Sequence, residues 1–144
     1  MNTLEHFKRI TMWVALAVAA VILPGCAGMS GGRSLNLSGA NEVPPVSTAA
    51  TGTGTITIGD DMSVSGSVTT TGVAGTAAHI HIGAVGANGP VIVPLAKTAD
   101  NVWSVPAGAK LKEDQYQAYK AGGLYVNVHS AANKGGEIRD QLKP

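Results

Sequence analysis

The chain has 144 residues, of which 44% are hydrophobic and 13% charged, and its formal net charge at pH 7 is +1. This near-neutral balance argues against the basic surface that nucleic-acid binding or adsorption to anionic lipid requires. The length that remains after a leader suits a single domain.

The N-terminal segment has the pattern of a secretory signal. Lys8 and Arg9 form a basic flank before the apolar run 10–23, which at about 14 residues is shorter than the ~20 of a membrane span. The only cysteine, Cys26, follows Leu23-Pro24-Gly25, and this stretch resembles the lipobox of bacterial lipoproteins. We predict lipidation of Cys26. The alternatives are an ordinary signal peptide with an incidental free thiol and an uncleaved N-terminal anchor.

This interpretation divides the chain into a lipoprotein signal peptide over 1–25, a lipidated tether over 26–34 and one domain over 35–144. Ala27 follows the cysteine, which resembles the outer-membrane default of Gram-negative lipoproteins. We therefore expect an exported protein that is anchored by lipid in the bacterial cell envelope, at the outer membrane. More than one acyl chain would make this attachment stable.

Beyond the tether, short runs alternate apolar and polar residues, which is typical of half-buried strands. The first run is 34–38, and the prolines of 39–46 then indicate a loop or a protected edge. Runs rich in β-branched residues at 53–58 and 62–70 flank the turn 59–61. This arrangement predicts a hairpin.

The second half of the chain continues with strand patterns and one helical pattern. The helical pattern covers 111–121, with Glu113 and Asp114 in its first turn and Gly122-Gly123 as its stop. The further strand patterns are 78–82, 91–95, 102–105, 124–130 and 136–142. Many short strands predict an all-β fold, an Ig-like or Greek-key β-sandwich with one short helix near the C-terminal third.

Two of the predicted strands carry histidines on their polar faces. His79 and His81 share one face of their strand, because side chains alternate along a strand, and His129 lies on the polar face of the strand at 124–130. Three imidazoles form a candidate mononuclear metal site that suits copper, zinc or nickel, and the usual affinity order favours Cu(II). We predict copper, with zinc as the alternative.

Three other polar residues are expected to share this face and to fix the imidazole tautomers by hydrogen bonds. They are Asn127, Glu137 and Arg139. A second interpretation remains open, in which the same residues and the histidines form a structural hydrogen-bond cluster without an ion. The sequence carries no nucleophile elbow and no phosphate-binding loop, so we predict no catalytic residue.

Five ordered stretches resemble the CHRD domain, first described in chordin and widespread in bacterial secreted proteins. They are 37–46, 78–83, 89–91, 123–130 and 136–139. The resemblance extends from about Leu35 to Leu142 and implies an extracellular setting. Asp140 is the main departure, since the family usually has glycine there on the inward face, and we expect the last strand to bulge or end at this residue.

A weaker, fold-level similarity is to copper-zinc superoxide dismutase, whose metal-binding strand also carries a His-x-His pair. His79 and His81 would match that pair, and His129 would match the late copper ligand. The zinc ligands and the bridging-histidine loop of that enzyme have no counterpart, so the similarity does not imply dismutase activity.

Two functions follow from these observations. The first is a lipid-anchored CHRD domain that binds copper through His79, His81 and His129 and acts in metal handling or electron transfer at the cell envelope. The second is a non-catalytic adhesion module with structural histidines, which presents loops such as 42–46 to an unidentified protein partner.

Overall fold

The computed structural model describes residues 32–144. The predicted signal peptide, the predicted lipidation site Cys26 and most of the tether lie outside the described residues. Among the described residues, no helix is long and apolar enough to cross a membrane.

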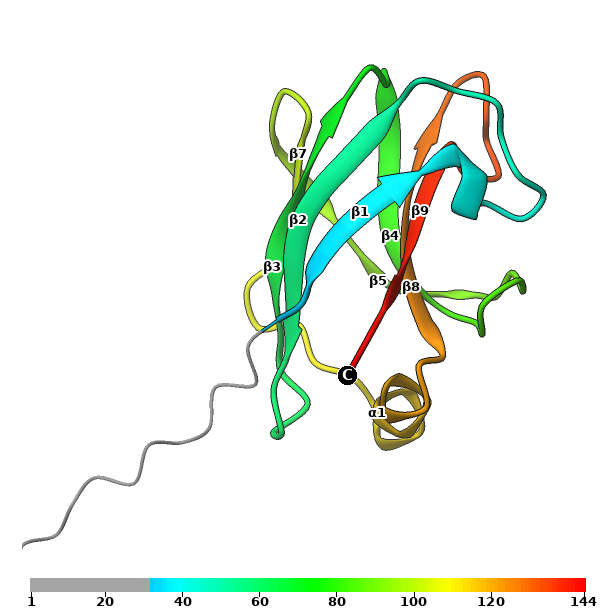
Figure 1. Ribbon diagram of the computed structural model, residues 1–144. Coiled ribbons are helices and arrows are strands. Elements are labelled where there is room, and N and C mark those ends of the chain that lie inside the picture. The colour runs from blue at the N-terminus through cyan, green and yellow to red at the C-terminus, as the bar shows by residue number, and fades with distance from the viewer. Residues whose placement is uncertain (1–31) are drawn as a thin grey trace, which may run out of the picture.

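The described chain forms nine strands in one sheet, in the order β5-β4-β8-β9-β1-β2-β3-β7-β6 (Figure 1). The strands are β1 (Ser34–Ser38), β2 (Thr51–Ile58), β3 (Val64–Thr71), β4 (Gly75–Ile82), β5 (Val91–Pro94), β6 (Ala96–Ala99), β7 (Val102–Ser104), β8 (Leu124–Ser130) and β9 (Ile138–Leu142). A 3-10 helix covers Gly39–Asn41, and the α-helix α1 covers Glu113–Lys120. All pairings between the strands are antiparallel.

The sheet curls until it is nearly closed, so that its two halves face each other across one core. The half with β5, β4, β8 and β9 meets the half with β1, β2, β3, β7 and β6 where β9 and β1 pair at a single position, Arg139 opposite Ser38. The chain crosses between the halves from β3 to β4, from β5 to β6 and from β7 to β8. The prediction of an all-β sandwich with one short helix is confirmed.

The core is aliphatic, because alternation along each strand turns one row of Val, Ile and Leu side chains inward. Ile80, Val126, Val128 and Ile138 have no measurable exposure, and Trp103 is 4% exposed. The opposite row on β4, β8 and β9 is polar. It is this outward row that carries the histidines.

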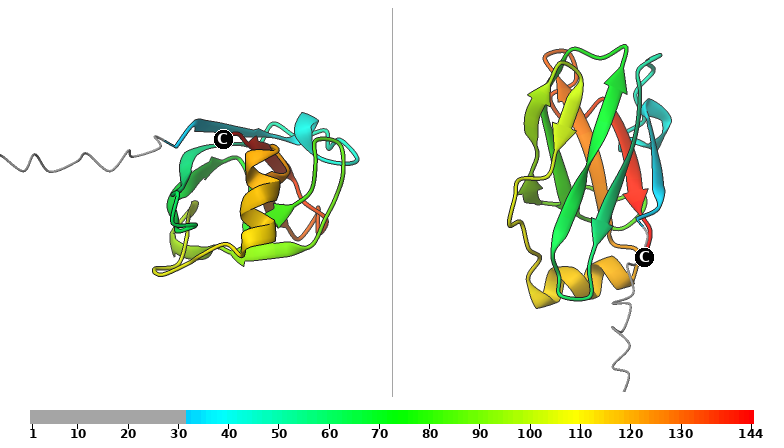
Figure 2. Two further views of the ribbon diagram at one scale, coloured as in Figure 1. Left: turned by 90° about the horizontal axis from the view of Figure 1, so that it is seen from below. Right: turned by 90° about the vertical axis from the view of Figure 1, so that its left-hand side faces the viewer.

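The helix α1 joins β7 to β8 and lies across one end of the sandwich (Figure 2). At its start the backbone N–H of Lys112 donates to Oε1 of Gln115 over 2.9 Å. It ends at Lys120, and Gly122, which follows the C-cap residue Ala121, has a φ of 73° in the left-handed region that favours glycine. The helix predicted from the sequence is therefore present, with slightly narrower bounds.

The interruption expected at Asp140 is not found. The pairing of β9 with β8 runs without a register shift from Ile138 to Leu142. The carboxylate of Asp140 accepts hydrogen bonds from the backbone N–H groups of Asn36 over 2.8 Å and Gln141 over 2.9 Å. An acidic side chain is tolerated on this face because it links β9 to β1 where the two strands have separated.

Candidate metal centre

The pairing of β4 with β8 brings the three histidines together. His79 lies opposite Asn127 in the ladder, and His129 lies opposite Ala77, one step away on the same face. The ring centroids of His79 and His129 are 4.8 Å apart, and those of His79 and His81 are 5.5 Å apart. One ring nitrogen from each histidine lies within 4.8 Å of the other two, so the three predicted ligands form one cluster.

Backbone carbonyls fix the tautomers of two of these rings. Nδ1 of His81 lies 2.8 Å from the carbonyl oxygen of Gly89, and Nδ1 of His129 lies 2.9 Å from that of Lys134. A carbonyl oxygen only accepts hydrogen bonds, so each Nδ1 carries the proton and each Nε2 carries a lone pair. Because Nε2 of His129 carries a lone pair, Nδ1 of His79 donates to it over 3.0 Å.

His81 is the most enclosed of the three, at 7% exposed. Within residues 32–144, its Nε2 is buried and has no hydrogen-bond partner. Burial lowers the pKa of His81, against the opposing effects of its hydrogen bond to Gly89 and of the adjacent Asn127 amide. Burial also lowers the pKa of His79, helped by the neighbouring His129 and His81. Both rings therefore favour the neutral form, which is the form that binds metal.

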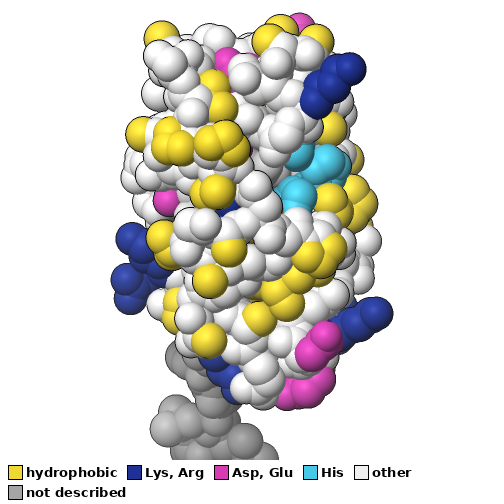
Figure 3. All heavy atoms as spheres, turned by 90° about the vertical axis from the view of Figure 1, so that its right-hand side faces the viewer, with side chains coloured by type: hydrophobic (Ala, Val, Ile, Leu, Met, Phe, Trp, Pro, Cys, Tyr) yellow, Lys and Arg dark blue, Asp and Glu magenta, His cyan; other side chains and the backbone are white. Residues whose placement is uncertain are grey.

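The cluster opens to solvent through a shallow pocket of about 510 Å³, and Figure 3 shows histidine side chains reaching the surface. The pocket is lined by Thr76, Ala77, His79, His129, Ser130, Ala131 and Lys134. Metal–imidazole bonds of ~2.0–2.1 Å place tetrahedral ligand nitrogens about 3.3 Å apart. The 3.0 Å separation of the His79 and His129 nitrogens is close to this value. The ring of His81 would have to move toward the other two to complete a tetrahedral site.

The sequence model of the CHRD domain family matches residues 33–142. The chain belongs to the CHRD domain family. The resemblance drawn from the five sequence stretches is thereby confirmed. No curated protein and no solved structure matches the chain, so the similarity to copper-zinc superoxide dismutase rests on the sequence pattern alone.

The residues predicted as hydrogen-bond partners of the imidazoles occupy different places in this CHRD domain. Asn127 is buried beside His81, and its Nδ2 donates to the carbonyl oxygen of Gly135 over 3.4 Å. Glu137 instead accepts a hydrogen bond from Oγ1 of Thr48 over 2.8 Å. In the part of the chain that the structure describes, neither Glu137 nor Arg139 bonds a histidine.

Sequence reasoning did not identify the two carbonyl partners, Gly89 and Lys134, or the role of Tyr125. The Tyr125 ring stacks on that of His81, with centroids 4.7 Å apart and planes 4° apart. The alternation along β8 already placed Tyr125 on the face of His129. The carbonyl partners had no such signal, because they depend on how two loops fold back over the sheet.

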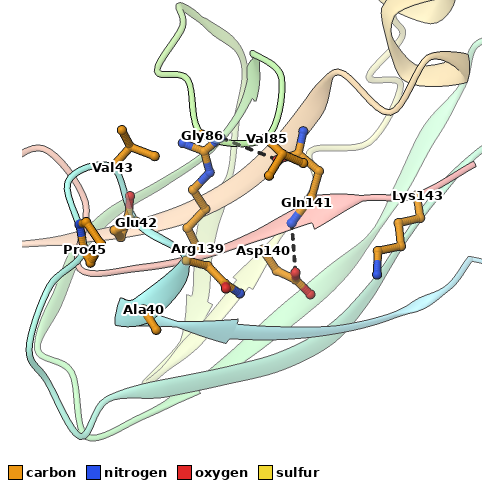
Figure 4. Close-up of a pocket in the computed structure, with 11 residues that line it drawn as sticks. Ala40, Glu42, Val43, Pro45, Val85, Gly86, Arg139, Asp140, Gln141 and Lys143 are labelled. Carbon is orange, nitrogen blue, oxygen red and sulfur yellow. Dashed lines mark hydrogen bonds between the residues drawn. The ribbon is translucent and has the colours of Figure 1, made fainter.

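Glu42 of the CHRD domain turns inward, whereas the alternative function, an adhesion module, would present its loop 42–46 to a partner. It is 4% exposed, and among residues 32–144 its Oε1 has no hydrogen-bond partner. Burial raises the pKa of Glu42, and the charge of Arg139 opposes this. Both residues border a pocket of about 560 Å³, which is shown in Figure 4.

Proposed function

We propose that this CHRD domain binds a single transition-metal ion, copper in preference, through His79, His81 and His129. We further propose that the chain is a lipoprotein of the bacterial cell envelope, held at the outer membrane through Cys26. The metal site and the anchor are independent parts of the proposal and are tested separately.

The hydrogen bonding of His81 carries the metal proposal. Its Nδ1–H is bound to the Gly89 carbonyl, and its Nε2 lone pair is buried without a donor. Metal-ligating histidines commonly show this pattern, with one nitrogen on a carbonyl and the other on the ion. In a purely structural cluster this nitrogen would have no hydrogen-bond donor among the described residues, and a buried polar atom without a partner costs about 1–3 kcal/mol. This favours the metal site over structural histidines.

The donor set argues for the identity of the ion. The cluster offers three imidazoles and, among the described residues, no carboxylate or thiolate. The only cysteine is Cys26, which the proposal assigns to lipid. Imidazole ligands suit copper, zinc and nickel, and Cu(II) binds most tightly in the usual order. Zinc in tetrahedral geometry is the second choice.

Three protein ligands leave a coordination position open, as in metal sites that exchange a ligand or act on one. Here that position would face the shallow pocket, where Thr76, Ser130 and Lys134 supply polar groups at the rim. Metal handling or electron transfer with a partner at the envelope would suit such an exposed site. No group in the pocket supports a more specific reaction.

Metal analysis of the whole protein tests the proposal. Protein from cells supplied with copper and zinc should retain about one ion per chain, and the stripped protein should rebind Cu(II) more tightly than Zn(II). H81A should lose this binding, whereas Thr98→Ala, on the far strand β6, should keep it. Wild-type protein that neither retains nor rebinds Cu(II), Zn(II) or Ni(II) at neutral pH would contradict the proposed site.

A further inference from the structure

Arg139 is a buried cation in the polar layer beside the candidate metal centre. It is 2% exposed, and the single ion pair in the described part of the chain joins Lys110 to Asp61. A buried charge without a carboxylate in contact costs free energy unless other groups hold it. The groups that contact Arg139 must therefore stabilise its buried charge.

The first contact is with the ring of Tyr125, which in turn stacks on the proposed metal ligand His81. The guanidinium carbon of Arg139 lies 3.4 Å from the ring centroid of Tyr125. The other neighbour of Tyr125 is His81, whose parallel ring lies 4.7 Å away. Because β8 runs between β4 and β9, Arg139 and His81 cover opposite faces of the tyrosine.

The second contact is with the loop 83–89. Nη2 of Arg139 donates to the carbonyl oxygens of Ala84 over 3.2 Å and Ala87 over 2.9 Å, and Nη1 donates to Oδ1 of Asn88 over 3.2 Å. Figure 4 shows the guanidinium pointing toward Val85 and Gly86 of this loop. The planar fork of one side chain thus holds the loop at several points.

The end of that loop, Gly89, contacts both stacked rings. Its carbonyl oxygen accepts from Nδ1 of His81 over 2.8 Å, and its N–H donates to the Tyr125 hydroxyl over 3.2 Å. A Cβ at Gly89 would collide with the carbonyl oxygen of Ile82, so the backbone is tightly placed here. Arg139 therefore acts on His81 from two directions, through the ring and through the loop.

We infer that Arg139 is a positioning residue of the metal centre, which fixes the ring plane and tautomer of His81 through Tyr125 and the loop 83–89. The inference rests on the proposed metal site and adds a residue that touches neither the ion nor a ligand. The effect of Arg139 on the tautomer is indirect, because Arg139 holds the loop whose Gly89 carbonyl oxygen accepts the hydrogen bond from the His81 ring.

The test compares R139Q and R139K with K143Q in the whole protein. Lys143 borders the same pocket as Arg139 but is exposed, so K143Q is the matched loss of a cation. Zn(II) affinity is measured by competition with a chelator, and the Cu(II) form is examined by electron paramagnetic resonance. Zn(II) reports ligand placement alone because it has no redox chemistry.

R139Q should bind Zn(II) about 10–100-fold more weakly than wild type, the usual loss when an outer partner of a ligand is removed. Its Cu(II) spectrum should also change, which a residue that only stabilises the fold would not cause. R139K should not restore either property, since an ammonium cannot donate as a planar fork. K143Q should match wild type.

Wild-type affinity and spectrum in R139Q would overturn the inference and leave the proposed function standing. Full rescue by R139K would also overturn it, because charge alone would then suffice. A wild type that binds no metal would refute the proposed function itself. If R139Q does not fold, Tyr125→Phe replaces it, since it keeps the ring but loses the hydroxyl that holds Gly89. An unchanged spectrum in both Tyr125→Phe and R139K would overturn the inference.

Discussion

Replacing His129 by alanine separates a metal site from a structural cluster. His129 is only half-buried, and it makes two hydrogen bonds, with His79 over 3.0 Å and with Lys134 over 2.9 Å. At about 0.5–1.5 kcal/mol net for each bond, the ion-free variant should lose about 1–3 kcal/mol of unfolding free energy. Thr98→Ala, which removes one exposed hydrogen bond with Ser104, is the control.

The ion should stabilise the folded protein by an amount of similar size, which is measured separately by adding Cu(II). An ion at a hundredfold excess over its Kd stabilises the folded state by about 2.7 kcal/mol. In a domain of this size 1 kcal/mol corresponds to a Tm shift of about 4 °C, so Cu(II) should raise the wild-type Tm by about 10 °C. With one of three ligands gone, H129A should show at most a small part of that rise, whereas Thr98→Ala should show all of it.

The assay is thermal unfolding of each protein at pH 7.5, with and without Cu(II), followed by circular dichroism. The reasoning is refuted if the wild-type Tm does not respond to Cu(II), Zn(II) or Ni(II) while ion-free H129A loses about 3 kcal/mol or more. That pattern is what a structural cluster predicts. A full Cu(II)-induced rise in H129A would instead remove His129 from the ligand set.

Three further predictions concern protonation and anchoring. Burial lowers the pKa of His79 and His81 from 6.5 in the folded protein. As the pH falls below about 6.5, these histidines are therefore protonated in the unfolded chain before they are protonated in the folded one. The protein without metal should lose stability over this range, until the pH has fallen below the folded pKa values. Urea unfolding between pH 7.5 and 5 measures this, and a flat profile would contradict it. Burial raises the pKa of Glu42, so ionisation of this carboxyl opposes folding. Glu42→Gln should then raise the urea midpoint at pH 7, by an amount that shrinks as the pH falls through that raised pKa; a lower midpoint at pH 7 would mean that the carboxylate is needed. Cys26→Ser should move the protein from the membrane fraction to soluble or unprocessed forms, and lipid-labelled membrane protein in the variant would exclude Cys26 as the acceptor.

The strands and the shared face of the histidines were predictable from sequence because both depend on alternation along a single strand. A period of two places His79 beside His81 whatever the rest of the chain does. The proximity of His129 required one further condition, the pairing of β4 with β8. Alternation along a single strand does not determine that pairing, and the structure supplies it.

The surroundings of the histidines were not predictable, for a physical reason. Charged residues are expected at the surface, yet Glu42 and Arg139 are buried because loops cover the outer face of the sheet. The tautomers of His81 and His129 depend on single carbonyl oxygens in those loops. Because every residue type has a backbone carbonyl, the pattern of side chains in the sequence cannot predict which carbonyl oxygen bonds each ring.

The long sequence separation of the histidines bears on when the cluster can exist. His79 and His129 are 50 positions apart, and β9 reaches β1 only after almost the whole domain has been made. Contacts of this range form late in folding, because a long loop must close before they contribute. A chain that crosses the inner membrane unfolded would carry no assembled cluster. The ion that such a chain finally holds would then be chosen by what is available where it folds.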